Sequence, residues 1–306
     1  MLRSGFIALS QNRQARAFSE RSPIGRRLSS RFVAGMSVPE ALDVARQLND
    51  DGISVSLDSL GESVLSAEQA HGSAAIYHEI LEQIAARDLR ANVSVKLTQM
   101  GMDFDPALAE DIVGNMVAHA ASINTFVRID MEGSNLTEAT LALTERLHAR
   151  PGSRGHVGTV LQAYLYRTER DAERLLSQGI RIRLCKGAYK EPASIAFPEK
   201  SDVDRNYIHL MKRLATSGVF CGLATHDESI IAAMRSFVTE HNLSKRAFEF
   251  QMLYGIRRDL QRQLAREGFG VRCYVPFGAE WYPYFMRRLA ERPANALFLA
   301  KNFFKN

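Results

Sequence analysis

Short apolar runs alternate with longer stretches of helical periodicity along most of the chain. Eight runs have the apolar and β-branched character of strands: Ile53–Leu60, Asn92–Met100, Thr125–Glu132, Val157–Leu165, Ile180–Gly187, Phe220–Asp227, Ala247–Leu253 and Val271–Gly278. The stretches between them show the spacing of amphipathic helices: Ala67–Arg87, Pro106–Ala121, Thr137–Ala149, Thr168–Gln178, Asp204–Ser217, Glu228–Glu240 and Arg257–Glu267. This alternation predicts parallel strands joined by helices.

The number of repeats favours a closed barrel. Eight strand–helix pairs, the last completed by Tyr282–Glu291, are the count of a (βα)8 TIM-type barrel, an α/β fold of about 250 residues. A doubly wound sheet is the rival, but it usually carries a GxGxxG turn after its first strand, and the chain has none there. We therefore expect a barrel domain over residues 53–306, preceded by an N-terminal helical arm over residues 1–52.

The N-terminal arm carries the excess positive charge. Seven arginines in the first 31 residues face one acid, Glu20, in a chain whose formal net charge is +5. Such a composition is typical of a packed amphipathic arm, of a mitochondrial presequence or of a membrane-surface contact. We favour the packed arm, because the basic stretch runs directly into a helix-like segment, Val38–Leu48. The rest of the chain is close to neutral, so no nucleic-acid partner is expected.

The amino-acid composition further limits the class of protein to which the chain can belong. Hydrophobic residues make up 46% of the chain and charged residues 24%, which is ordinary for a globular protein with a large core. No apolar run reaches the roughly 20 residues that a membrane-spanning helix needs. The three cysteines lie far apart in apolar runs, which predicts buried thiols instead of a disulfide framework or a zinc site. No metal is expected, although His226, Asp227 and Glu249 keep that option open.

Polar residues recur in the second half of the strand runs. Burying a charged group costs free energy unless it is paired or used. In a barrel, the C-terminal ends of the strands line the face where active sites form. Run by run, these residues are Glu62 (just after the first run), Lys96, Asp130 and Glu132, Gln162, Arg183 and Lys186, Thr225 with His226 and Asp227, Glu249 and Gln251, and Tyr274. Their agreement across the runs predicts an active site at that end.

Lys96 stands in the middle of one run, and Asp130 lies in the next. A lysine in this place serves either as a Schiff-base amine or as a cation for an anionic ligand. Because a neighbouring carboxylate keeps an ammonium charged, we expect Lys96 and Asp130 to pair, and we favour anion binding. A Schiff-base aldolase that uses Lys96 is the alternative from a different class of enzyme.

The fifth run ends in two cations and a small turn. Arg183 and Lys186 precede Gly187 and Ala188, where the glycine lets backbone amides approach a ligand closely. Such a turn suits a phosphate or the electron-rich edge of a flavin. The helix that begins just after His226 offers a second place for an anionic group.

The last helix predicts a receptor for a small carboxylate. Tyr284, Arg287, Arg288 and Glu291 fall at i, i+3, i+4 and i+7 and therefore share one helical face. Each guanidinium is a planar fork that matches carboxylate oxygens two at a time, and the ring beside them is an apolar wall. A solvated face with an Arg287–Glu291 pair is the alternative.

These residues sit in ordered blocks that match one known family. The blocks are LGESV (60–64), VSVKLTQMG (93–101), VRIDME (127–132), GTVLQAYLYRT (158–168), RLCKGAYKEP (183–192), ATHDE (224–228), FEFQMLYG (248–255) and YFMRRLAERPAN (284–295). With them the chain closely resembles the proline dehydrogenase family in its monofunctional bacterial form, from about residue 53 to the C-terminus. Lys190 departs from the large bifunctional relatives, which carry an aromatic residue there, and this favours the monofunctional type.

The resemblance implies a flavoenzyme on a distorted (βα)8 barrel. Such an enzyme oxidises L-proline to Δ1-pyrroline-5-carboxylate by hydride transfer to N5 of FAD, and its electrons pass to a membrane quinone, in the first step of proline catabolism. The expected location is cytoplasmic, with peripheral contact at the inner membrane surface as a further option. Homo-oligomers are compatible with the sequence, which does not define the oligomeric state.

The same resemblance implies roles for individual residues. The cations for the proline carboxylate are Lys96, Arg287 and Arg288. The walls around the ring are Tyr189, Leu253, Tyr274 and Tyr284. Asp130 holds Lys96 and the neighbouring site in place, while Glu62 and Glu291 pair with the two arginines of the last helix. The groups for FAD are Arg183 as donor to N5, Gln162 at the isoalloxazine, and Lys186, Gly187, Ala188, Thr225 and His226 for the rest.

Two further alternatives concern the ligand. Hydroxyproline or another cyclic amino acid could replace proline as substrate, but the hydroxyl of Tyr274 would crowd a ring substituent and so favours proline. A barrel that only binds an amino acid would hold proline without a flavin.

Overall fold

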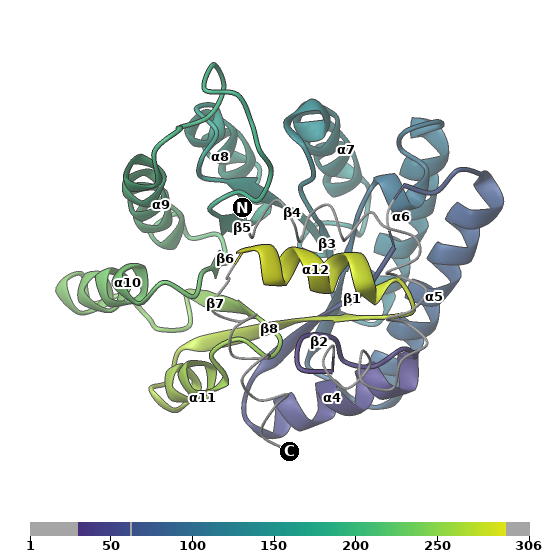
Figure 1. The fold of residues 1–306 in the computed structure, drawn as a ribbon, viewed down its shortest axis with the longest axis horizontal. Coiled ribbons are helices and arrows are strands. Elements are labelled where there is room, and N and C mark those ends of the chain that lie inside the picture. Colours follow the sequence, from purple (N-terminus) through teal and green to yellow (C-terminus); the bar gives the residue numbers. More distant parts are fainter. Residues whose placement is uncertain (1–29, 62, 292–306) are drawn as a thin grey trace.

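A closed barrel of eight parallel strands forms the centre of the molecule (Figure 1). The computed structural model describes residues 30–61 and 63–291, with side chains as far as residue 286. The strands follow one another around the barrel in chain order: β1 (Ser54–Ser59), β2 (Ala91–Val95), β3 (Val127–Ile129), β4 (Val157–Gln162), β5 (Arg181–Cys185), β6 (Cys221–Ala224), β7 (Phe248–Leu253) and β8 (Gly270–Phe277). Pairing of β8 with β1 closes the sheet, which confirms the predicted (βα)8 TIM-type barrel.

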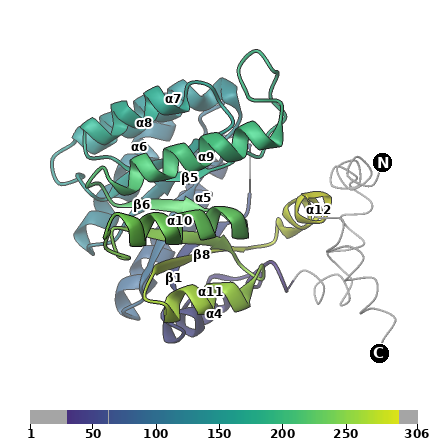
Figure 2. The same cartoon turned by 90° about the vertical axis from the view of Figure 1, so that its left-hand side faces the viewer.

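Helices surround the barrel, and one of them lies across its C-terminal end (Figures 1 and 2). The surrounding helices are α5 (Ala67–Ala86), α6 (Pro106–Ser122), α7 (Thr137–Ala149), α8 (Thr168–Ser177), α9 (Lys200–Ala215), α10 (Glu228–Glu240) and α11 (Arg258–Arg266). The last, α12 (Trp281–Glu291), follows β8 and crosses the end to which the strands point (yellow in Figure 1). Among the described residues, no helix combines the length and apolarity needed to cross a bilayer.

Within residues 30–53, one helix precedes the barrel. It is α4 (Val38–Asp50), whose N-cap Ser37 has a backbone N–H that donates to Glu40 Oε2 at 3.0 Å. This pairing satisfies a donor that the helix start would otherwise leave open. Its buried face, which includes Ala41, Leu42 and Ala45, joins the main apolar core against β1 and β8. The later part of the predicted arm therefore packs on the barrel, and residues 1–29 lie outside the described part.

The apolar core lies between the strands and the helices. Outward-facing strand residues such as Val55, Leu57 and Val93 are fully buried under the helices. The alternate residues point into the barrel and are polar: Ser56 Oγ and Ser94 Oγ lie 2.9 Å apart across β1 and β2. Because side chains of a strand alternate between its two faces, the barrel has an apolar jacket and a polar interior.

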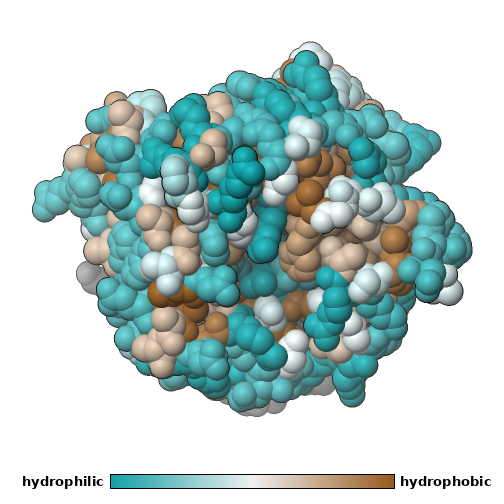
Figure 3. Space-filling model, turned by 180° about the vertical axis from the view of Figure 1, so that it is seen from behind, coloured by the Kyte–Doolittle hydropathy of each residue, from teal (hydrophilic) through white to brown (hydrophobic). Residues whose placement is uncertain are grey.

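The predicted strand Asn92–Met100 is too long. β2 ends at Val95, and Thr98–Met100 forms the 3-10 helix η1 at the mouth of the barrel. A second 3-10 helix, η2 (Ser134–Leu136), follows β3. These turns place Lys96 and Asp130 just beyond the ends of their strands, at the end that α12 crosses. Figure 3 looks onto the opposite end, where hydrophilic side chains surround a hollowed centre and hydrophobic ones gather in patches.

Candidate active site at the C-terminal end of the barrel

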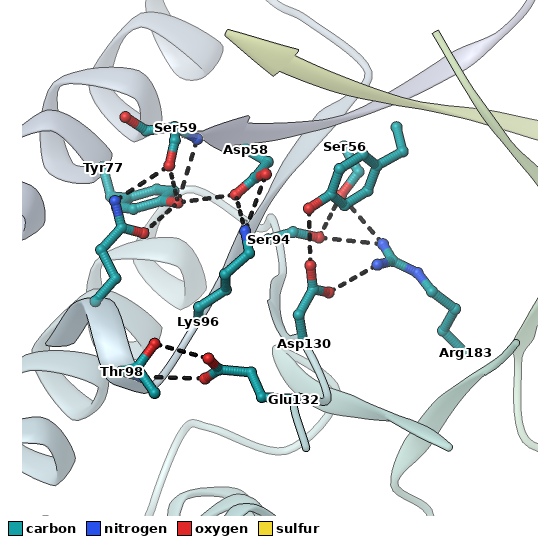
Figure 4. A network of polar contacts seen from close by, with 12 residues as sticks. Ser56, Asp58, Ser59, Tyr77, Ser94, Lys96, Thr98, Asp130, Glu132 and Arg183 are labelled. Carbon is teal, nitrogen blue, oxygen red and sulfur yellow. Dashed lines mark hydrogen bonds and ion pairs between the residues drawn. The ribbon is translucent and has the colours of Figure 1, made fainter. Parts of the chain in front are cut away.

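Asp130, directly after β3, is the centre of a polar network at the mouth of the barrel (Figure 4). Its Oδ1 accepts a hydrogen bond from Arg183 Nη1 at 2.8 Å, and its Oδ2 accepts one from the Tyr274 hydroxyl at 2.9 Å. Burial, together with the carboxylates of Asp130 and Asp58, raises the pKa of Tyr274 well above its ordinary value. The tyrosine therefore stays protonated and donates, and both oxygens of Asp130 are held in place.

Arg183, on β5, reaches across the interior and is 6% exposed. Its Nε donates to Gln251 Oε1, and its Nη2 lies 3.1 Å from Ser94 Oγ and 3.4 Å from Ser56 Oγ. Its Cζ lies 5.3 Å from the centroid of the Tyr274 ring, within the range of a cation–π contact. Residues of β1, β2, β7 and β8, together with Asp130 after β3, thus fix one guanidinium at the centre of the barrel.

Lys96 pairs with Asp58 of β1, so the predicted pairing with Asp130 is wrong. Lys96 Nζ lies 2.9 Å and 3.0 Å from the two Asp58 carboxylate oxygens, and Asp58 is 1% exposed. Lys96 and Asp130 do follow neighbouring strands, as expected. However, Arg183 on β5, which is separated from β3 by β4 alone, pairs with the carboxylate of Asp130, a contact that strand order alone does not reveal.

Asp58 is the main residue that the sequence reasoning missed. The Tyr77 hydroxyl, from α5, lies 3.4 Å from Asp58 Oδ1 and accepts a hydrogen bond from the Ser59 backbone N–H at 3.2 Å. Burial first, and then the charge of Asp58, raises the pKa of Tyr77 well above its ordinary value. The sequence does hold a signal for Asp58, because it follows Ser56 by two residues and so shares its inward-facing side.

Glu132 and Gln162 hold the loops beside this network. Glu132 accepts hydrogen bonds from the Thr98 backbone N–H at 3.1 Å and from the Thr98 hydroxyl at 2.7 Å. Gln162, at the end of β4 and 2% exposed, donates from Nε2 to the Glu132 carbonyl at 3.2 Å. These contacts tie the ends of β2, β3 and β4 to one another.

Lys186 lies between two carboxylates. Its Nζ is 2.5 Å from Asp204 Oδ1 and 2.8 Å from Asp227 Oδ2. Asp227 also caps α10 by accepting a hydrogen bond from the Ser229 backbone N–H at 3.1 Å. Desolvation opposes the charge of Asp227, but the hydrogen bonds from Lys186 and Ser229 outweigh it and hold its pKa well below the ordinary value. Asp204 was not among the residues predicted for this site.

His226, Asp227 and Glu249, the residues considered for a metal site, have other partners. His226 Nε2 accepts a hydrogen bond from the Leu253 backbone N–H at 2.9 Å, so the proton of the neutral ring lies on Nδ1. Asp227 pairs with Lys186, and Glu249 pairs with an arginine at the far end of the barrel. Within the part of the chain that the structure describes, no three or more His, Cys, Asp or Glu residues are grouped to hold a metal.

The turn after β5 requires a glycine. Gly187 has a φ of +120°, and a Cβ on it would lie 2.4 Å from the Tyr164 ring. Ala188 and Tyr189 follow as exposed residues, with Tyr189 at 46% exposure. Thr225, 6% exposed at the end of β6, accepts a hydrogen bond from the Asp227 backbone N–H at 3.1 Å. The ends of β4, β5 and β6 therefore offer a glycine turn and buried polar side chains on one side of the mouth.

An apolar cluster lies beside the polar network. Leu253 and Tyr284 belong to it, and Tyr284 on α12 is 7% exposed. Its other members are Phe32, Val33, Met36, Leu60, Ile256, Trp281, Tyr282, Phe285 and Met286. The backbone positions of Arg287, Arg288 and Glu291 belong to α12, but their side chains lie outside the described part, as does Glu62.

The predicted site residues thus fall into two groups. Lys96, Asp130, Arg183 and Tyr274 belong to a partly buried polar network, while Gln162, Lys186, Thr225 and His226 line the ends of three adjacent strands. The carboxylates of the network are engaged by cations, so the arrangement suits holding and orienting a ligand more than moving protons.

Comparison with known proteins gives one consistent result. The family model for proline dehydrogenase matches residues 41–301. The chain is 40% identical to proline dehydrogenase 1 of Bacillus subtilis over the full length of both, and 43% identical to proline dehydrogenase of Deinococcus radiodurans, covering 91% of this chain and 90% of that one. Among solved structures it is similar to proline utilization A from Bdellovibrio bacteriovorus, with a TM-score of 0.82 and 25% identity; the match covers 91% of this chain and 34% of that chain.

Proposed function

The chain belongs to the proline dehydrogenase family and oxidises proline, and we propose that it does so with FAD, producing Δ1-pyrroline-5-carboxylate. The observation that carries the cofactor proposal is the side of the mouth formed by β4, β5 and β6, with its glycine turn and buried polar side chains. A membrane quinone is the proposed final electron acceptor. The cytoplasmic location, peripheral membrane contact and homo-oligomers named above stay predictions.

Family membership overturns the aldolase alternative, and the Lys96–Asp58 pair supplies a physical reason. A carboxylate 2.9 Å from Nζ stabilises the ammonium form, which is not a nucleophile. The charge that makes Lys96 a poor Schiff-base amine makes it a good partner for a carboxylate. We propose that Lys96 acts with Arg287 and Arg288 to hold the carboxylate of proline.

The proline ring would lie against apolar and aromatic walls. Tyr284 and Leu253 share one apolar cluster next to the mouth. Tyr274 is the register partner of Leu253 in the β7–β8 pair, and its hydroxyl donates to Asp130. Tyr189 is the fourth proposed wall residue. Asp130 acts as a positioning residue in this scheme, because it fixes both Arg183 and the Tyr274 hydroxyl. Glu62 and Glu291 are proposed partners of the two arginines on α12.

Residues on three adjacent strands fit the proposed cofactor. At Gly187 the backbone passes close to the Tyr164 ring, where a side chain would collide with that ring. The glycine therefore permits the exposed turn that follows, and this turn can lie flat against a ligand. The remaining proposed FAD-binding residues are Gln162, Arg183, Lys186, Ala188, Thr225 and His226. When bound, FAD supplies the hydride acceptor at N5, which this chain's own side chains do not provide.

The chain contributes mainly position and charge. Removing a hydride from a carbon next to a neutral amine needs alignment more than acid–base catalysis, and orientation can lower a barrier by about 7–11 kcal/mol. A fixed cationic Arg183 at the centre of the barrel would stabilise negative charge that develops nearby. Its hydrogen bonds to Asp130, Gln251 and Ser94 keep it there before any ligand arrives.

The position of Tyr274 favours proline over hydroxyproline. Its hydroxyl donates to Asp130 at 2.9 Å, so the side chain cannot turn away from a substituted ring without losing a partly buried hydrogen bond. Leaving such a group unpaired costs about 1–3 kcal/mol. We therefore expect proline to be the better substrate.

An anaerobic visible spectrum tests the proposal. Purified protein should show flavin absorption that bleaches when L-proline is added, and bleach more slowly with hydroxyproline at equal concentration. A flavin that ignores proline would contradict the substrate assignment while keeping the cofactor. A colourless protein that FAD does not reconstitute would contradict the cofactor proposal.

A further inference from the structure

A second concave site lies at the N-terminal end of the barrel, away from the active site (Figure 3). Its cavity has a volume of about 600 Å³ and opens to solvent. Arg181 lines it from the start of β5 and Arg272 from the start of β8. Arg90, Asn92 and His156 add further polar groups to the wall.

Arg181 is a half-buried cation that lacks a polar partner. In residues 30–61 and 63–286 its guanidinium makes no hydrogen bond and no ion pair, and its recorded contacts are with two aromatic rings. Its Cζ lies 5.3 Å from the Phe126 ring centroid and 5.7 Å from that of Phe220. Burial lowers the pKa of Arg181, and repulsion from Arg272 adds to this although the charge of Glu249 opposes it. A charge that is partly desolvated and unpaired is costly, so an anion would be favoured beside it.

A second arginine lies beneath the same aromatic ring. Arg128 is 4% exposed, and its Cζ is 4.6 Å from the Phe126 ring centroid. Its Nη1 donates to the carbonyls of Thr159 and Arg181, both at 2.8 Å, while its buried Nε has no hydrogen-bond partner. Gly158 leaves room for this guanidinium, because a Cβ there would lie 3.1 Å from Nη1.

One buried carboxylate balances these cations only in part. Glu249, 5% exposed, accepts a hydrogen bond from Arg272 Nε at 2.6 Å and another from Gln251 Nε2 at 2.6 Å. Arg272 Nη1 donates hydrogen bonds to the Val55 carbonyl at 2.8 Å and to Asn92 Oδ1 at 2.9 Å. Three arginines therefore share a single buried acid, Glu249, and Asp88, an acid that lines the cavity, is exposed. The inner part of the cavity keeps an excess of positive charge.

We propose that this cavity binds a small anion bearing a phosphate or carboxylate group, and that Arg181 is its principal ligand-binding residue. A guanidinium with unused N–H donors matches such a group two oxygens at a time. The charge lies inside a cavity instead of on a raised face, which favours a soluble anion over a lipid headgroup.

The test measures phosphate binding to the FAD-saturated protein. Saturation with FAD occupies the proposed phosphate-binding groups of the active site. Inorganic phosphate should raise the unfolding temperature in a concentration-dependent way, compared with sodium chloride at equal ionic strength. Isothermal titration should give one site per chain. Arg181→Gln should weaken the phosphate affinity roughly tenfold or more, as expected when a charged hydrogen-bond donor is lost.

Two further variants separate the site from general charge. Arg246→Gln removes the same charge from an exposed residue of the loop before β7 that does not line the cavity, and should leave the phosphate response unchanged. Arg181→Lys keeps the positive charge but loses the paired N–H donors of the guanidinium. Its phosphate affinity should therefore fall between those of the wild type and Arg181→Gln. This variant also keeps the experiment informative if Arg181→Gln folds poorly.

Three results would overturn the proposal. One is a phosphate response no larger than that of chloride, and another is a response that Arg181→Gln leaves intact. The third is binding to phosphatidylglycerol vesicles that depends on Arg181 without any response to free phosphate, which would assign the cavity to a lipid headgroup.

Discussion

The two ends of the barrel differ in how their inward-facing cations are paired. At the C-terminal end, Lys96 pairs with Asp58, and Arg183 pairs with Asp130. At the N-terminal end, Arg128 and Arg272 have the carboxylate of Glu249 for balance, while Arg181 has no polar partner among the described residues. Both ends belong to the same eight-stranded barrel, so the difference lies in the side chains and not in the fold.

The contrast separates two uses of a buried cation. A cation that is paired before the ligand arrives is held in one position, and this suits a reaction that depends on alignment. A cation without a partner is poorly compensated, and it gains most from any anion that enters. The paired end should therefore lose function and stability when its pairs are broken, while the unpaired end should tolerate loss of its arginine.

The largest effect is expected for Asp130→Ala. Removal of this carboxylate leaves buried Arg183 without its acid and the Tyr274 hydroxyl without its acceptor. Breaking a buried pair from one side costs about 3–5 kcal/mol of folding stability, and misplacement of the reacting groups costs about 100-fold or more in kcat/KM. Urea unfolding and steady-state kinetics with proline measure the two effects. Asp130→Asn, which keeps an acceptor for Tyr274, should lose less; equal losses in both variants would contradict the positioning role.

Arg288→Met should give the next largest effect. This change removes one cation of the proposed carboxylate clamp while keeping the length of the side chain. The KM for proline should rise about 10- to 100-fold, as expected for loss of a charged hydrogen bond. FAD should remain bound, which its absorption spectrum checks. An unchanged KM would remove Arg288 from the clamp.

Asp58→Asn tests the other pair of the active end. Lys96 would keep its position but lose the carboxylate 2.9 Å away, at a cost of about 1–3 kcal/mol in the free energy of unfolding. Arg181→Gln is the matched change at the opposite end, and it should alter stability by less than about 1 kcal/mol, because no hydrogen bond or ion pair of the described structure is lost. A larger loss for Arg181→Gln than for Asp58→Asn would break the comparison between the ends.

The smallest effect is expected outside both ends, between α5 and α6. His78 Nδ1 and His119 Nδ1 lie 2.9 Å apart, and burial followed by the charge of His119 lowers the pKa of His78 below its ordinary value. A histidine with a lowered pKa in the folded state binds fewer protons than in the unfolded state, so stability falls as the pH drops below about 6.5. After screening by solvent, the loss should stay under about 1 kcal/mol. His119→Gln should flatten this dependence in urea unfolding between pH 5 and pH 7.

The barrel itself could be predicted from the sequence, because it depends on local patterns. Each strand run and each helix shows its own periodicity, and eight repeats leave few ways to close a sheet. The ends of the strands were harder to predict. Residues 98–100 read as strand but form η1, since the chain turns after Val95 to bring Lys96 to the mouth.

The pairing within the site could not be predicted in the same way. Lys96 and Asp130 are neighbours by strand order, yet Arg183 on β5, beyond the intervening β4, pairs with Asp130. Such a contact depends on the width of the barrel and on the length of the arginine, which no local pattern contains. For the same reason the sequence does not distinguish Arg181 from other strand residues. That its guanidinium has no polar partner among the described residues follows only from the three-dimensional structure.

Gln251 has a consequence for how relatives of this chain can change in evolution. Its amide nitrogen faces Glu249 and its amide oxygen faces Arg183, so the side chain has a defined direction along the barrel axis. An acid at this position would repel Glu249, and a hydrocarbon would leave two buried groups unpaired. Substitutions at residues 183, 249 and 251 should therefore occur together in the history of the family, and the two ends of the barrel cannot drift independently.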